Sequence, residues 1–169
     1  MPSAVTTFLL MGALTVTSGQ SCWTFKEVSA LCADIDLQPC DAGEYRLNDD
    51  SCITILPTRM NFQEAQEGCQ LVGGAVVKVQ NEEEHKRLLC MMFDTVPVQL
   101  HYWIGAKRGP DGFNWVRGGE PLEFAPWREG QPDNFNDNED CVWTNARCWG
   151  PWNDMPCSEL SSVPCQIPK

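Results

Sequence analysis

Ten cysteines in a chain of 169 residues constrain the fold more than any other feature of the sequence. They occupy positions 22, 32, 40, 52, 69, 90, 141, 148, 157 and 165. There is no CxxC pair and there are only two histidines, so a structural zinc site has little support. An even number of cysteines at this density predicts a disulfide framework formed in an oxidising compartment.

Residues 1–19 have the features of a secretory signal peptide. They carry no charged side chain, and their apolar run, residues 8–16, is too short to span a bilayer. Thr17 and Gly19 suit the −3 and −1 positions of a signal-peptidase site. The alternative is a buried N-terminal helix. No later apolar run is long enough to cross a membrane, so the sequence predicts a secreted, extracellular protein with no membrane span.

The charge balance limits the class of partner. Twenty-three acidic and twelve basic residues give a formal net charge of −11. A surface that binds phosphate groups needs the opposite balance, which argues against nucleic acid, heparin and anionic membranes as partners.

Two helices are expected in the first half of the chain. Asn61 can cap a helix that ends at Gly73, and Asn81 with Glu84 forms a capping-box-like start for a second helix that reaches Met92. The buried face of the first helix is expected to carry Phe62, Ala65, Cys69 and Val72.

The second half reads as short strands and long loops. The stretch between Gly105 and Asp140 is rich in Gly, Pro and Asn, and such a long irregular stretch usually carries function. Helices followed by strands predict an α+β domain. Strands are expected at 75–79, 102–104, 113–116 and 141–143, and the tryptophans assigned to the core are Trp103, Trp115, Trp143 and Trp152.

The residues that carry chemistry lie near the C-terminus, on two short segments that each precede a cysteine. Clustered carboxylate and amide oxygens suit hard divalent cations, and Ca²⁺ takes six to eight of them. An EF-hand is excluded because Asn138 stands where its loop needs glycine. The oxygen-bearing side chains are Gln131, Asp133, Glu139, Asn153 and Asp154.

Two other interpretations of the acidic segment 133–140 are open. Asn and Asp dominate turns for local reasons, so the segment could be only a solvated turn. A glycosidase would need one carboxylic acid held protonated in an apolar pocket, well separated from the other. No constellation of acid, base and nucleophile stands out, so we do not expect an enzyme.

Together these features resemble a C-type lectin-like domain of the long form over residues 40–169, with residues 20–39 as an N-terminal arm. The resemblance implies an α+β fold of two helices, short antiparallel sheets and a long calcium-binding loop region. It also implies the disulfides Cys40–Cys52, Cys69–Cys165 and Cys141–Cys157. The matching pieces are Cys40…Cys52, the helix ending in Cys69, Trp103-Ile104-Gly105-Ala106, Gln131-Pro132-Asp133, Cys141-Val142-Trp143, Trp152-Asn153-Asp154 and Cys157…Cys165.

Four cysteines remain outside this scheme. A local Cys22–Cys32 bridge is the first expectation. Cys90 and Cys148 could pair, stay free or link to another chain, which would give a homo-oligomer.

The resemblance also implies a mode of binding. Gln131, Asp133, Glu139, Asn153 and Asp154 would hold one Ca²⁺, with Pro132 after a cis peptide bond. Basic residues at 107–108 replace acids of an auxiliary site, so one calcium site is expected. Two sugar hydroxyls would bind the ion and the same side chains.

The Gln-Pro-Asp order is similar to that of galactose-type members of the family. Phe135 could stack on the sugar or pack onto its own loop. The expected partners are glycans ending in galactose or N-acetylgalactosamine, and innate immune recognition of microbes is a role that such binding would suit. The alternative is a domain of this fold that binds a protein, a matrix component or ice.

Overall fold

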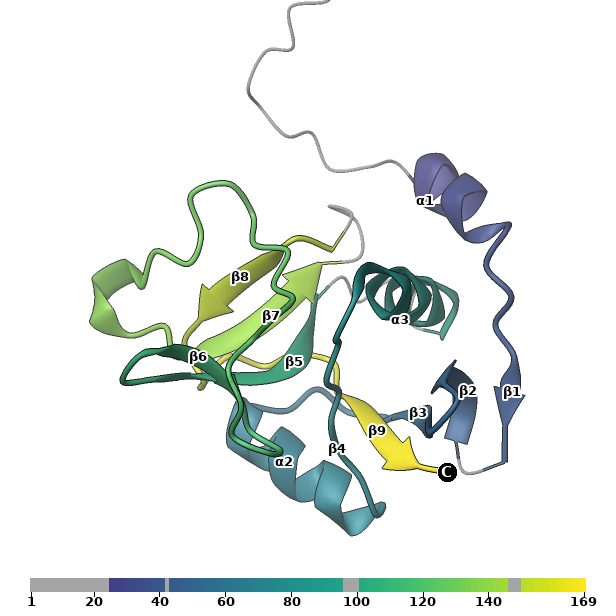
Figure 1. The fold of residues 1–169 in the computed structure, drawn as a ribbon, viewed down its shortest axis with the longest axis horizontal. Coiled ribbons are helices and arrows are strands. Elements are labelled where there is room, and N and C mark those ends of the chain that lie inside the picture. Colours follow the sequence, from purple (N-terminus) through teal and green to yellow (C-terminus); the bar gives the residue numbers. More distant parts are fainter. Residues whose placement is uncertain (1–24, 42, 96–100, 146–149) are drawn as a thin grey trace, which may run out of the picture.

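The computed structural model describes residues 25–41, 43–95, 101–145 and 150–169 and shows an α+β fold (Figure 1). Its helices are α1 (Phe25–Cys32), α2 (Phe62–Leu71) and α3 (Glu82–Thr95), with a short 3₁₀ helix η1 (Phe135–Asp137). Its strands are β1 (Pro39–Cys40), β2 (Gly43–Asn48), β3 (Ser51–Ile55), β4 (Ala75–Val76), β5 (His101–Gly109), β6 (Gly112–Trp115), β7 (Cys141–Asn145), β8 (Trp152–Met155) and β9 (Pro164–Pro168).

The strands form two sheets. The first has the order β1-β2-β3-β9-β4, so the last strand of the chain lies between two early ones (Figure 1). The second has the order β6-β5-β7-β8 and carries the long loop before β7. All strand pairs named here are antiparallel. The α+β class expected from the sequence is therefore confirmed.

Gly105 allows the two sheets to approach each other. Its N–H donates to the Val77 carbonyl at 2.8 Å. A Cβ atom at this position would lie 2.4 Å from the Val76 carbonyl oxygen, which real side chains do not tolerate. Glycine is required here because the backbone of β5 runs directly against the chain that follows β4.

The two expected helices are present with their expected caps. The Asn61 side chain accepts from the Glu64 N–H, and Glu64 accepts from the Asn61 N–H, which completes a capping box. At α3, the Asn81 side chain accepts from the Glu84 N–H at 2.9 Å. On α2, residues Phe62, Ala65 and Cys69 are buried, but Val72 lies past the last turn and is exposed, so its assignment to the buried face was wrong.

The apolar residues divide into two clusters. The larger lies between α3 and the sheets and includes Trp115 and Trp152. The smaller packs α2 against Trp103 and the Cys69–Cys165 disulfide. Trp143, expected in the core, is only partly buried: it packs against the edge of the smaller cluster, and the His101 ring stacks on it with 4.0 Å between the ring centroids.

The N-terminal arm contains a helix that the sequence did not reveal. In α1, Val28 is completely buried and belongs to the larger cluster. A single helical stripe of apolar residues in eight positions is too short to give a clear periodic signal. The proposed signal peptide, residues 1–19, lies outside the described residues. No helix in the described part of the chain has the length and apolar character needed to cross a membrane.

Four disulfides join the described residues. Three are the bridges that the resemblance implies: Cys40–Cys52, Cys69–Cys165 and Cys141–Cys157. The fourth joins Cys32 to Cys90, so the expected Cys22–Cys32 bridge was wrong. Because α1 ends against α3, the two Cα atoms are 5.5 Å apart. Cys22 and Cys148 lie outside the described residues.

The Cys32–Cys90 bridge gives the first testable prediction. Replacing both cysteines by serine should lower the free energy of unfolding by about 2–4 kcal/mol, because the bridge closes a long loop of the unfolded chain. Equilibrium denaturation measures this difference. Non-reducing peptide mapping of the wild-type protein should find Cys32 linked to Cys90, and a peptide joining Cys22 to Cys32 would contradict the fold described above.

Candidate functional site

Strands β7 and β8 and the loop before β7 bring the candidate residues together. In the antiparallel pair, Val142 lies opposite Asp154 and Cys141 lies opposite Met155. The Cys141–Cys157 disulfide joins the same two segments. Asp154, in the middle of β8, therefore lies beside the loop that enters β7.

Three carboxylates converge at this point. One oxygen from each of Asp133, Glu139 and Asp154 lies within 4.8 Å of the others. Glu139 and Asp154 are buried, whereas Asp133 is exposed. Burial raises the pKa of Glu139, and the nearby charges of Asp154 and Asp133 raise it further.

Backbone N–H groups of the loop also point at these carboxylates. Asp154 accepts from the N–H of Asp133 at 3.1 Å and from that of Asn134 at 2.8 Å. Glu139 accepts from the N–H of Phe135 at 3.0 Å. These bonds fix the loop to β8 and leave the cluster of three negative groups with further lone pairs for a cation.

The Asn and Asp residues of the loop also serve its backbone. Asn134, Asn136 and Asp137 have φ values of 48°, 57° and 53°, a region that Asn and Asp adopt more readily than other residues. The Asn134 side chain accepts from the Glu139 N–H at 3.0 Å. The turn interpretation is thus confirmed for these residues of the loop, while the ligand interpretation of Asp133 and Glu139 stays a prediction.

The remaining predicted residues lie around the cluster. The Gln131–Pro132 peptide bond is cis, as the resemblance implies, and the Gln131 side chain accepts from the Asp133 N–H. The Asn153 amide donates to the Asp154 backbone carbonyl at 2.8 Å. Phe135 does not pack into the loop and leaves 66% of its surface exposed.

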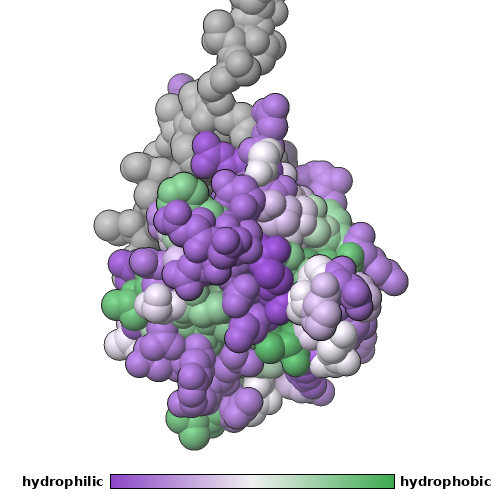
Figure 2. All heavy atoms as spheres, turned by 90° about the vertical axis from the view of Figure 1, so that its left-hand side faces the viewer, coloured by the Kyte–Doolittle hydropathy of each residue, from purple (hydrophilic) through white to green (hydrophobic). Residues whose placement is uncertain are grey.

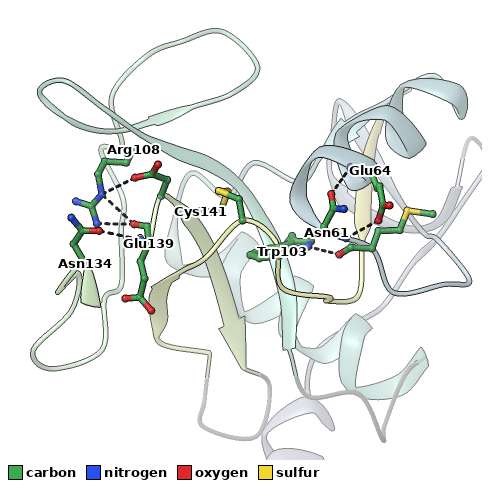
Figure 3. Close-up of a disulfide and its surroundings, with 10 residues drawn as sticks. Asn61, Glu64, Trp103, Arg108, Asn134, Glu139 and Cys141 are labelled. Atoms are coloured by element: carbon green, nitrogen blue, oxygen red, sulfur yellow. Dashed lines mark hydrogen bonds and ion pairs between the residues drawn. A yellow bond between two sulfur atoms is a disulfide. The ribbon is translucent and has the colours of Figure 1, made fainter. Parts of the chain in front are cut away.

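Sequence reasoning missed one functional residue, Arg108. We interpreted it only as a base in place of an auxiliary acid. In the structure its guanidinium donates to the Asp154 carboxylate. It also donates to the Glu139 backbone carbonyl (Figure 3). A register shift in β5 between Ile104 and Lys107 precedes it, and a shift of this kind is not visible in a single sequence.

The face that carries this loop is polar. Figure 2 views the molecule from the side on which η1 and β8 lie in Figure 1 and shows a continuous hydrophilic band with small separate hydrophobic areas. This surface suits a polar ligand better than an extended apolar partner.

The donor set fits a calcium ion. Calcium prefers carboxylate, amide and carbonyl oxygens in flexible geometry, and this end of the protein offers three carboxylates with amide side chains on both segments. No cysteine or histidine belongs to the cluster, which argues against zinc.

Comparison with known proteins identifies the family. The lectin C-type domain profile matches residues 58–167. The chain is 31% identical over 134 residues to the C-type isolectin Sp-CL4 of Scorpaena plumieri, with 79% of this chain and 92% of the relative covered. It is 30% identical over 154 residues to a perlucin-like protein of Mytilus galloprovincialis, with 88% and 95% covered.

A calcium-independent type II antifreeze protein has the same fold, with a TM-score of 0.63, 23% identity, and coverage of 80% of this chain and 98% of the other. The matched region contains both helices α2 and α3, the second sheet and the carboxylate cluster. The chain therefore belongs to the C-type lectin domain family, whose members are generally binding proteins and not enzymes.

Proposed function

We propose that this protein is a secreted, calcium-dependent lectin that binds glycans ending in galactose or N-acetylgalactosamine. The observation that carries the proposal is the convergence of Asp133, Glu139 and Asp154 within 4.8 Å on a polar face of a C-type lectin domain. A binding protein without a metal has no need for three acids at such close range, because their mutual repulsion destabilises the fold.

The proposed ligands are acids and amides, which have different roles. Asp133, Glu139 and Asp154 supply a formal charge of −3, while Gln131 and Asn153 add neutral oxygens and N–H donors. A bound Ca²⁺ would reduce the charge to −1 and supply open coordination positions for two adjacent sugar hydroxyls. The same acids can accept a hydrogen bond from each hydroxyl, and the amides can donate one to it.

The preference for galactose rests on the order of residues around Pro132. Gln131 places an amide before it and Asp133 an acid after it, as in galactose-type members of the family. The exposed Phe135 ring lies two residues further on and offers a flat apolar surface for the apolar face of a sugar.

A domain of this fold that binds a non-sugar partner is the competing function. The similarity to a calcium-independent antifreeze protein shows that the fold alone does not decide between them. Calcium dependence separates the two, since only the sugar-binding mechanism places the ion between protein and ligand.

Removal of calcium gives the first test of this proposal. With an extracellular-type Kd of about 0.1–1 mM, calcium at about 2 mM should stabilise the fold by about 0.6–1.8 kcal/mol, and EDTA should abolish glycan binding. A glycan array and thermal melts with and without EDTA measure both effects. Undiminished glycan binding in EDTA would exclude the mechanism.

Glu139→Gln should have opposite effects in the two states. In EDTA it should raise the melting temperature, because it removes one of three crowded acids while an amide oxygen can still accept from the Phe135 N–H. In buffer with calcium, the same substitution should remove most of the stabilisation that the bound ion provides. Differential scanning calorimetry of both proteins in both buffers measures the sign of each effect.

The pH dependence follows from the raised pKa of Glu139. Without metal, the charged form of Glu139 destabilises the wild type. This destabilisation is complete above the pKa of Glu139 in the folded state and disappears as pH falls toward its ordinary pKa of 4.5. In EDTA the difference between wild type and Glu139→Gln should therefore shrink on acidification. A difference that grows as pH falls would contradict the assignment.

Specificity can be tested at fixed charge. The double substitution Gln131→Glu with Asp133→Asn keeps the number of acids and amides, so calcium affinity should change little. It exchanges the positions of the acid and the amide, and so decides which sugar hydroxyl meets an acceptor. Because a mismatched hydrogen bond costs about 1–3 kcal/mol, the affinity for mannose relative to that for galactose should rise tenfold or more. Competition assays with the two monosaccharides measure the ratio, and an unchanged galactose preference would place selectivity elsewhere.

Phe135→Ala is the companion variant. If the exposed ring stacks on the sugar, its removal should weaken galactose and leave calcium affinity and mannose binding nearly unchanged. An equal loss for both sugars would mean that the ring supports the loop.

A further inference from the structure

Arg108 lies among oxygens from three residues. Its Nη2 donates to Asp154 Oδ2 at 2.5 Å, and its Nε and Nη2 donate to the Glu139 carbonyl at 3.1 and 2.9 Å. Its Nε lies 3.5 Å from Asp140 Oδ1. The guanidinium also lies over the Phe113 ring, 4.5 Å from its centroid. The side chain is thus held on several sides, as its planar fork of donors allows.

The partners of Arg108 belong to separate parts of the chain. Glu139 and Asp140 end the loop, whereas Asp154 belongs to β8 and its side chain is completely buried. A buried carboxylate is costly unless it is paired and hydrogen-bonded. Arg108 is the cation that compensates Asp154, and in doing so it ties β5, the loop and β8 together.

Arg108 contacts the backbone carbonyl of Glu139 and not its carboxylate. Figure 3 shows the guanidinium directed at the backbone of Glu139, while the Glu139 carboxylate points away from it. On Asp154, Arg108 binds Oδ2, and Oδ1 accepts only a backbone N–H, that of Asp133, among the contacts of the described residues. A metal ion and Arg108 can therefore bind different atoms of the same loop.

We propose that Arg108 is a positioning residue: an internal cation that fastens the loop of residues 131–140 to β8 and so preforms the calcium site before the ion binds. This inference rests on the proposed function and adds to it that the loop needs no second metal ion. The loop becomes ordered when the protein folds, so calcium binds a site that is already assembled and does not have to order it.

Two variants and one control test the proposal. Arg108→Gln removes the charge and most of the donors, and Arg108→Lys keeps the charge but cannot reach all three partners at once. Lys107→Gln is the matched control, because it removes one positive charge from the neighbouring, exposed position of the same strand.

The first measurement is amide hydrogen exchange in EDTA, which needs no calcium. The N–H groups of Asp133 and Asn134 report directly on the loop because both donate to Asp154. In Arg108→Gln their exchange should quicken about tenfold or more, while the Gly105 N–H, bound to Val77, stays protected. Arg108→Lys should restore part of the protection. Unchanged exchange at Asp133 and Asn134, or an equal loss at Gly105, would overturn the proposal.

The second measurement is calcium affinity by isothermal titration calorimetry, where the sign is decisive. If Arg108 preforms the site, Arg108→Gln weakens calcium binding about tenfold although a positive charge has been removed. If Arg108 only repels the ion, the same variant binds calcium more tightly, and the proposal is wrong. Lys107→Gln should change the Kd less than twofold. A wild type that binds no calcium would refute the proposed function, while the exchange experiment would still judge the role of Arg108.

Discussion

The buried carboxylate of Asp154 is the constraint on which this end of the molecule depends. With its side chain completely removed from solvent, it must find donors, and it finds them in the Asp133 and Asn134 N–H groups and in Arg108. Because these donors lie on the loop of residues 131–140 and on β5, their hydrogen bonds to Asp154 hold the loop against β8. The same folding brings Asp133 and Glu139 close enough to repel each other and to attract a cation.

Scaffold and loop are stabilised differently. Two apolar clusters, the antiparallel pairing of β3 with β9 and the Cys69–Cys165 disulfide hold the scaffold. The loop is held by hydrogen bonds to charged groups, by residues in left-handed conformation and by the neighbouring Cys141–Cys157 bridge. A calcium-independent antifreeze protein shares the fold, so the fold alone does not decide what the loop binds.

Local signals in the sequence were enough to predict much of this structure. The caps at Asn61 and Asn81 fixed the start of both main helices, because a cap needs only neighbouring residues. The convergence of Asp133, Glu139 and Asp154 followed from the family resemblance. Features that depend on distant packing were not predictable: α1 docking on α3 and its Cys32–Cys90 bridge, the partial burial of Trp143, and the contact of Arg108 with Asp154.

The most direct test of the account is a crystal structure with calcium and N-acetylgalactosamine bound. We expect one Ca²⁺ at this end of the protein, bound by Asp133, Glu139 and Asp154, with two hydroxyls of the sugar on the ion. Arg108 should still contact the Glu139 carbonyl. A sugar bound elsewhere, or a sugar bound here with no metal between it and the carboxylates, would contradict the account.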